Sequence, residues 1–329
     1  MMSSMTEATD SSTALWGGIL FSFVFTALIW YAGGHWLAPG ALTPDRPGFW
    51  YEWQLQEPTV WTRATAWTGY LLHQVSIWWL IWTAQKERPG YSRGLHRFNV
   101  LALGVNAVFI ALHFVQTQVW YDGLAQDVHE GTAQWSVIVL LIAVLAMENK
   151  RRGLVFGVGS NWVERAGPFL RRYHGYFFSW AVIYTFWYHP MEDTWGHLFG
   201  FFYMFLLMLQ GSLFFTRAHV NRRWTVVLEV TFAFHGAMVA YLAGQGQGWQ
   251  MFLMGGLAMF IITQMHGLGL SRRARWLIAF GYFCGVVLLY AVRGWQYVPE
   301  LAGIPLTLLS GVFVLSLLVL GGQRVLRPA

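Results

Sequence analysis

The chain has 329 residues, of which 56% are hydrophobic and 11% are charged, whereas a soluble domain carries about 25% charged residues. The net charge of +6 does not indicate a nucleic-acid partner, because the basic residues lie in short loops between apolar runs. The single cysteine, Cys284, can form neither an internal disulfide nor a thiolate metal cluster.

Ten segments are apolar and long enough to cross a bilayer, which needs about 20 residues, or about 17 at the short end. The first follows an acidic, polar start that lacks the basic region of a cleaved signal peptide, so we expect it to remain as an anchor. Backbone groups inside a bilayer must pair within their own segment, so the spans are predicted to be helices. The predicted spans are 14–36, 62–84, 97–120, 133–149, 173–189, 195–216, 224–244, 247–269, 274–292 and 301–322.

The charges of the loops support both the number of spans and their orientation. With the N-terminus in the cytoplasm, the cytoplasmic segments hold all of the 21 Lys and Arg residues except Arg46, Arg63 and Arg293. Cytoplasmic loops of membrane proteins are enriched in basic residues in this way. The sequence therefore predicts an all-α, polytopic membrane helix bundle with about ten transmembrane helices. We expect residues 1–329 to form a single transmembrane domain with both termini in the cytoplasm, in a bacterial inner (plasma) membrane.

Three histidines lie well inside predicted spans, where burying an ionisable side chain is costly and usually functional. His73, His235 and His113 lie about 16, 13 and 10 Å below the outer ends of their helices, at 1.5 Å per residue. Three imidazoles at similar depth could be ligands of a b-type haem, or could hold one transition-metal ion. The structural alternative is that each imidazole only bonds to a neighbouring helix.

Other polar residues accompany these histidines inside the spans. Asn99, Asn106 and His113 are spaced seven residues apart, which is nearly two helical turns, so the three side chains are predicted to share one helix face. Gln116 follows one turn beyond His113. Glu229 lies in the seventh predicted span, toward its cytoplasmic end.

The segment Tyr188–His197, YHPMEDTWGH, concentrates titratable groups at the predicted outer edge of the membrane. Pro190 should end the fifth span, and Asp193 or Thr194 could cap the sixth. If Asp193 and His197 share a helix face, the carboxylate would orient the imidazole. The alternative is an ordinary turn with a capping acid. The candidates for a metal or proton-transfer site here are His189, Glu192, Asp193 and His197.

Asp122 adds a candidate from another outer loop, because it lies nine residues beyond His113 and close to the end of that span. The complete assignment has three groups. The catalytic candidates are Asp193, Glu192 and Asp122; the cofactor-binding candidates are His73, His113 and His235; and the candidate metal ligands are His73, His113, His189, His197 and His235.

Some classes of membrane protein are excluded by what the chain lacks. Its two lysines, Lys86 and Lys150, lie at or beyond helix ends, so a retinal Schiff base within the bundle is excluded. The chain has no phosphate-binding glycine loop, so it is not itself an ATP-driven pump.

The leading hypothesis is therefore a membrane oxidoreductase or metalloenzyme with a haem b or a histidine-bound transition metal in the outer half of the bundle. Its substrate would be a lipophilic small molecule such as a quinone or a lipid, which would reach the site from the lipid bilayer or the outer surface. The alternative is a proton-coupled secondary transporter that uses Glu229, His73 and His235. A third hypothesis is a non-catalytic subunit with a membrane-protein partner.

Overall fold

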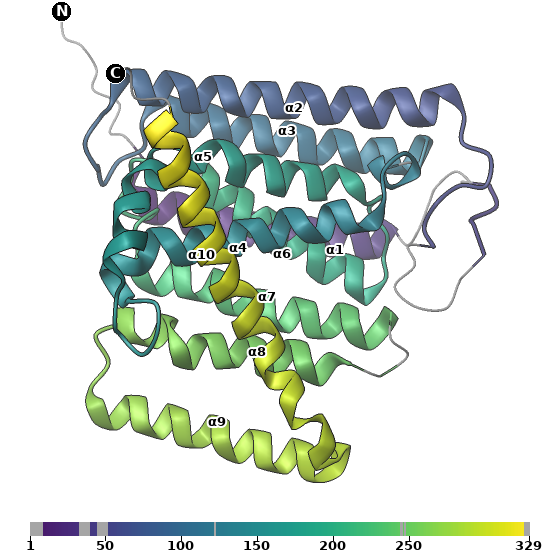
Figure 1. Cartoon of the computed structure of the whole chain (residues 1–329). Coiled ribbons are helices and arrows are strands. Elements are labelled where there is room, and N and C mark those ends of the chain that lie inside the picture. Colours follow the sequence, from purple (N-terminus) through teal and green to yellow (C-terminus); the bar gives the residue numbers. More distant parts are fainter. Residues whose placement is uncertain are drawn as a thin grey trace, which may run out of the picture. The chain divides into compact units, whose positions relative to one another are not determined.

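The computed structural model describes residues 9–32, 40–44, 52–121, 123–243, 246 and 248–325. These residues form ten α-helices and three 3₁₀-helices (Figure 1). The fold divides into two compact units, one of Met1–Ser136 and Gly175–Thr225 and the other of Val137–His174 and Val226–Ala329. The division falls within α4 (Glu130–Arg152), α5 (Asn161–Tyr188) and α7 (Arg222–Ala243), so the chain passes between the units inside helices.

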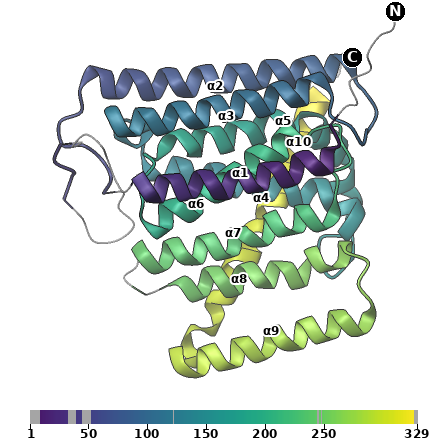
Figure 2. The same cartoon turned by 180° about the vertical axis from the view of Figure 1, so that it is seen from behind.

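The first unit is built on α1 (Ser11–Ala32), α2 (Val60–Glu87), α3 (Arg97–Val119) and α6 (Trp195–Ser212), together with the short η1 (Leu124–Gln126). Helix α2 packs along α3, and α1 packs along α6, as Figures 1 and 2 both show.

Backbone hydrogen bonds define one end of this unit. The amide of Ser11 donates to Arg93 O at 2.7 Å, and the amide of Arg217 donates to Ser92 O at 2.8 Å. The start of α1, the loop between α2 and α3 and the segment after α6 therefore meet at that end.

The second unit contains α8 (Trp249–Ile262), α9 (Arg272–Arg293) and α10 (Gly303–Val325), with the 3₁₀-helices η2 (Gln264–Gly267) and η3 (Trp295–Ala302). Helix α8 packs against both α9 and α10, and α10 runs obliquely to the other two (Figures 1 and 2).

Side-chain caps account for several helix starts. The hydroxyls of Thr59, Thr194 and Ser271 each accept a hydrogen bond from a backbone amide in the first turn of α2, α6 and α9, which satisfies a donor that has no partner inside the helix. Helix α5 ends at Tyr188, two residues before Pro190, which has no amide hydrogen to continue it. The predicted turn between the fifth and sixth spans is confirmed.

Among the described residues, six helices are long and apolar enough to cross a membrane, namely α1, α3, α4, α7, α9 and the segment Trp295–Val325 that includes α10. These lengths and this composition are typical of a multi-pass helical membrane protein.

Two elements differ most from their predicted spans. Helix α5 begins at Asn161, well before the predicted span 173–189, because its first turns carry Arg and Glu residues that lower the hydropathy without disfavouring a helix. Helix α8 has only 14 residues, although it runs unbroken through Gly255 and Gly256. It ends where Thr263 leaves helical geometry and its hydroxyl donates to Met259 O at 2.9 Å.

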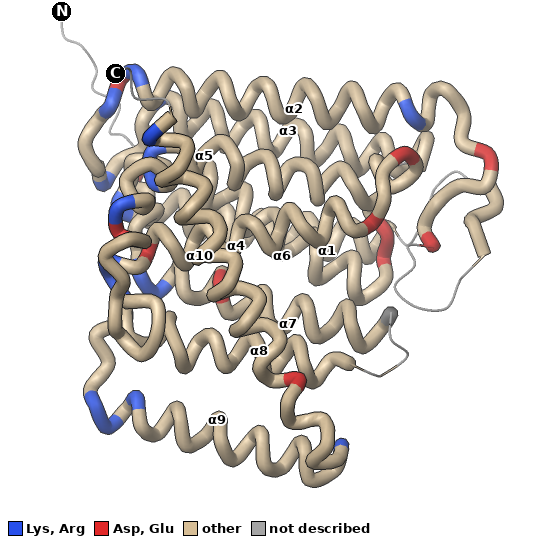
Figure 3. The backbone as a smooth tube through the Cα atoms, in the orientation of Figure 1, with Lys and Arg blue, Asp and Glu red and all other residues tan. Residues whose placement is uncertain are grey.

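Within each unit, most Lys and Arg residues lie toward one end (Figure 3). In the first unit, Lys86 lies in the last turn of α2 and Arg97 begins α3, next to the backbone bonds that gather one end. In the second unit, the last turn of α4 is entirely basic, and the amide of Phe156 donates to Ile262 O at 2.8 Å, which places the end of α4 beside the end of α8. This segregation follows the pattern that the positive-inside rule predicts.

Candidate functional site

His73 lies at the middle of α2 and its side chain is fully buried. Its Nδ1 accepts a hydrogen bond from Trp187 Nε1 at 3.3 Å, and its Nε2 lies 2.7 Å from Asn106 Oδ1. An indole N–H can only donate, so Nδ1 carries no proton and Nε2–H donates to the asparagine. The two partners therefore fix His73 as one neutral tautomer.

The hydrogen bonds of His73 continue into α6 through the polar face of α3. Asn106 Nδ2 donates to Ser212 Oγ at 2.8 Å, and that hydroxyl donates to Met208 O at 2.8 Å. Asn99 Nδ2 donates to Ser212 O, also at 2.8 Å. Asn99, Asn106 and His113 are all buried, as expected for side chains on one inward face. These bonds tie α2, α3 and α6 together.

Trp187 of α5 lies between the imidazoles of His73 and His113. Its indole donates to His73, and its ring centroid is 4.3 Å from that of His113. A Cβ atom at Gly69 would lie only 2.2 Å from Trp187 Cη2, so a glycine is required for the indole to approach α2 this closely. Gly69 precedes His73 by four residues and shares its helix face.

His113 is fully buried and faces oxygen atoms on both sides. Its Nε2 donates to His189 O at 2.8 Å, and its Nδ1 lies 3.0 Å from Gln116 Oε1. A doubly protonated ring donates a hydrogen bond to both oxygens. A neutral ring donates to His189 O and accepts from the Gln116 amide nitrogen when that amide group is rotated by about 180°. Both ring nitrogens of His113 are therefore hydrogen-bonded in either form of the ring.

The predicted outer-edge candidates surround the start of α6. The ring centroids of His189 and His197 are 5.5 Å apart, and Glu192 and His197 are both buried. Asp193 precedes α6, and the hydroxyl of Thr194 lies 2.8 Å from Nδ1 of His197. The structure thus brings His113, His189 and His197 together, while Asp122 lies outside the described residues.

Of the predicted three-histidine centre, the first unit contains His73 and His113, whereas His235 belongs to the second unit, on α7. His235 is partly exposed there, unlike the other two. The structure therefore brings two of the three imidazoles together around Trp187.

The imidazoles of His73 and His113 do not fit a haem or a metal ion in the conformation of this structure. A ligand histidine must offer a ring-nitrogen lone pair to the metal. All four ring nitrogens of His73 and His113 already lie within hydrogen-bond distance of protein groups. Among the described residues, no group of three or more His, Cys, Asp or Glu side chains is placed to hold a metal ion.

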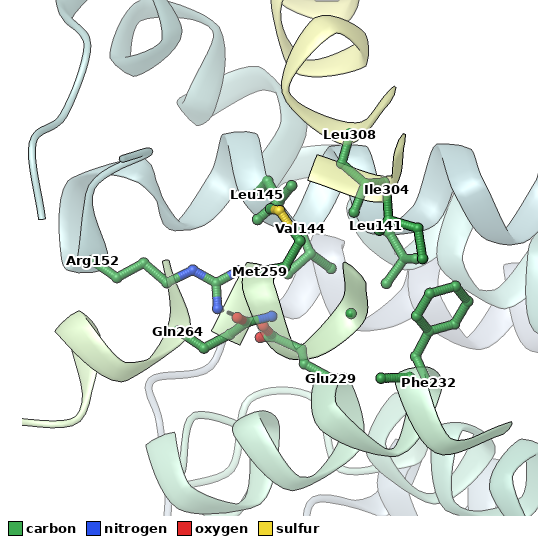
Figure 4. Close-up of a pocket in the computed structure, with 12 residues that line it drawn as sticks. Leu141, Val144, Leu145, Arg152, Glu229, Phe232, Met259, Gln264, Ile304 and Leu308 are labelled. Atoms are coloured by element: carbon green, nitrogen blue, oxygen red, sulfur yellow. Dashed lines mark hydrogen bonds and ion pairs between the residues drawn. The ribbon is translucent and has the colours of Figure 1, made fainter. Parts of the chain in front are cut away.

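The second unit contains a buried ion pair. Arg152, the last residue of α4, donates through Nη1 to Glu229 Oε2 of α7 at 2.5 Å. The Arg152 side chain is 0% exposed and that of Glu229 is 11% exposed. Figure 4 shows the two groups meeting, with Gln264 beside them. Burying such a pair costs free energy of desolvation. Removing one partner strongly destabilises the folded protein, because the other charge is left buried without a partner.

A cavity of about 30 Å³ adjoins this ion pair. Its lining residues all belong to the second unit and come from α4, α7, α8, η2 and α10. Arg152, Glu229 and Gln264 are its polar side chains, and the other lining residues are apolar or glycine. A Cβ atom at Gly256 would lie 2.4 Å from Ala233 Cβ, so α8 approaches α7 closely one turn beyond Glu229.

Sequence reasoning missed the roles of Arg152, Trp187 and Gln264. Arg152 follows Lys150 and Arg151, and the sequence gives no sign of which of three consecutive basic residues turns inward. The one available signal was Glu229, because a carboxylate inside a predicted span requires a partner.

Comparison with known proteins finds no matching family model, no matching curated protein and no matching solved structure.

Proposed function

We propose that this chain is a proton-coupled secondary transporter with about ten membrane spans. We place it in a bacterial inner membrane with both termini in the cytoplasm. The main support for the proposal is the buried Arg152–Glu229 ion pair. This pair adjoins a cavity that is lined by α4, α7, α8, η2 and α10. Ionisable pairs within transmembrane helices mark ion and substrate pathways and proton relays.

Glu229 would be the proton carrier in this proposal. In its ionised form the carboxylate is held by Arg152. A proton on Glu229 removes the charge attraction and leaves the guanidinium to interact with another anion. Two protonation states therefore correspond to two arrangements of charge around the cavity, which is the property that coupling requires.

The polar groups of the first unit support a route for protons at the proposed outer side. His113 bonds to the backbone of His189, and the His189 ring lies beside that of His197. We propose that these imidazoles, together with Glu192 and Asp193, exchange protons with the medium, and that Asp122, predicted from the sequence alone, takes part. The lipid bilayer is the surrounding partner in this proposal.

The membrane oxidoreductase or metalloenzyme acting on a quinone or lipid remains a prediction. The transporter is preferred because His73 and His113 offer no free ring nitrogen, whereas Glu229 has a defined charged partner beside a cavity. A non-catalytic role beside a membrane-protein partner also remains a prediction.

The test is solute-dependent proton movement in proteoliposomes that contain a pH-sensitive dye. A panel of organic anions, amino acids and sugars is added outside, and the signal from protein-free liposomes is subtracted. We expect at least one solute to move protons, and we expect Glu229→Gln to abolish that movement. The matched control is Glu164→Gln, because Glu164 pairs with Lys150 at an exposed site of the same unit. Equal flux in wild type and Glu229→Gln would refute the proposal.

A further inference from the structure

Only part of the Arg152 guanidinium is hydrogen-bonded to the described residues. Its Nη1 donates to Glu229, whereas Nε and Nη2 have no partner among the described residues, although the side chain is fully buried. Buried N–H groups are nearly always hydrogen-bonded, to protein or to a bound molecule. The Nε–Nη2 edge therefore requires an acceptor that the described residues do not supply.

The cavity beside Arg152 limits the size of that acceptor. Its volume of about 30 Å³ could hold two or three water molecules, each of which needs about 10–15 Å³. A planar oxyanion of three heavy atoms fits this space better than a sugar, a nucleotide or an amino acid does. The two N–H groups of a guanidinium edge lie in one plane and match two oxygens of a planar oxyanion.

The charge of the pair sets a condition on anion binding. Arg152 and Glu229 together are neutral, so an added anion would leave one uncompensated negative charge in a largely apolar cavity. Such a charge is expensive to bury. If Glu229 takes up a proton as the anion binds, the occupied site is neutral again. Anion binding and protonation of Glu229 are therefore expected to be linked.

Other charged groups of the second unit have partners of their own. Arg151, next to Arg152 on α4, is paired with Glu148 on the same helix. Arg275 of α9 contacts the ring of His266, which lies in η2. The residues that α8 and α10 contribute to the cavity lining carry no charge. Glu229 is thus the titratable group of the cavity lining that can balance an incoming anion.

We propose that this cavity binds a small monovalent oxyanion, of the size and class of formate, on the Nε–Nη2 edge of Arg152, with uptake of one proton by Glu229. One anion and one proton enter together, no covalent bond of the anion changes, and nothing is oxidised or reduced. This inference deepens the proposed function and rests on it for transport, whereas the binding step can be measured alone.

The test is calorimetric titration of the detergent-purified full chain with formate, in two buffers that differ in ionisation enthalpy. The difference between the buffers gives the number of protons taken up. We expect about one proton per formate, and an affinity that falls about tenfold per unit rise in pH wherever Glu229 is ionised. Glu229→Gln mimics the protonated acid, so it should bind formate without proton uptake and without dependence on pH.

Variants of Arg152 test the binding edge. Arg152→Lys keeps the positive charge but removes the paired N–H edge, so formate affinity should fall at least about tenfold. The matched control is Arg151→Gln, which should bind like wild type. Because Arg152→Gln alone leaves a buried carboxylate unpaired, the double variant Arg152→Gln/Glu229→Gln is used to remove both charges. It should fold and bind no formate.

Three results would overturn the inference. They are an absence of formate binding, which would assign the space to water alone; equal affinity in wild type and Arg152→Lys; and binding without proton uptake in wild type. An absence of formate binding combined with Glu229-dependent proton flux for another solute would overturn this site and leave the proposed function standing. Formate binding with no proton flux for any solute would leave this site standing and overturn the proposed function.

Discussion

At the scale of single residues, the buried imidazole of His73 is specified by its partners. Trp187 supplies a donor and Asn106 supplies an acceptor, so the ring is satisfied in one neutral tautomer. A buried acceptor that loses its donor costs more free energy than an average hydrogen bond contributes. The stability of the first unit should therefore respond to each of these partners individually.

Replacing Trp187 with Phe tests this, because an aromatic ring is kept while the N–H donor and part of the buried indole are removed. Nδ1 of His73 would be left buried without a partner, so we expect a loss of about 1–3 kcal/mol, seen as a lower melting temperature in detergent. Trp79→Phe is the control, because Trp79 lies on α2 with its side chain 58% exposed. Equal effects of the two substitutions would show that the hydrogen bond contributes nothing measurable.

The polar candidates were identified from the sequence more reliably than their partners. Asn99, Asn106 and His113 could be placed on one face because helical spacing is a local property. The contacts of His73 with Trp187, and of Glu229 with Arg152, join residues far apart in the chain. Such contacts depend on helix packing, which hydropathy and spacing do not encode.

At the scale of elements, close packing of α7 and α8 positions the ion pair. Gly256 of α8 faces Ala233, which lies one turn beyond Glu229 on α7. Any side chain at Gly256 would separate the two helices and move Glu229 relative to Arg152.

Gly256→Ala should therefore destabilise the protein, although alanine favours helix more than glycine does. We expect a loss of about 1–3 kcal/mol from overpacking, together with weaker proton coupling in proteoliposomes. Gly281→Ala is the control, because a Cβ at Gly281 of α9 meets nothing within 4 Å; it should be neutral or stabilising by up to about 1 kcal/mol. The account of this packing fails if the two alanines behave alike.

The start of α6 depends on Thr194, whose hydroxyl accepts from the His197 amide at 3.4 Å and contacts the His197 ring. Thr194→Ala should cost about 0.5–2 kcal/mol of stability. Thr194→Ser keeps the hydroxyl and should restore most of the loss. Thermal unfolding of the three proteins measures the difference, and a serine variant no better than alanine would exclude capping as the cause.

The helices themselves were largely predictable, because apolar runs and cap residues are features of local sequence. The end of α5 at Tyr188 and the Thr194 cap are confirmed. The early start of α5 was missed because its first turns are charged, and the short α8 was missed because hydropathy does not detect the change of geometry at Thr263.

At the scale of the whole molecule, the proposed topology depends on which helix ends face the cytoplasm. Within each unit, basic residues gather at one end (Figure 3). The sequence predicts this distribution, because cytoplasmic loops retain Lys and Arg.

Single cysteines in a Cys284→Ala background test the topology. We expect cysteines at Gly90 and Arg272 to react with a membrane-impermeant maleimide only from the cytoplasmic side. Cysteines at His129 and Gln296 should react only from the outer side. All four positions are exposed. If the cysteines at Gly90 and His129 react from the same side of the membrane, the proposed orientation is wrong. The same holds if those at Arg272 and Gln296 react from the same side.

The most direct measurement of the central claim is the protonation state of Glu229 itself. Infrared difference spectra of the reconstituted protein, recorded between neutral and acidic pH, report the carbonyl stretch of a protonated carboxyl group. The account predicts a reversible band that persists in Glu164→Gln and is missing in Glu229→Gln. If Glu229 stays ionised throughout the range in which the protein is folded, the ion pair is only structural and proton coupling at this site is wrong.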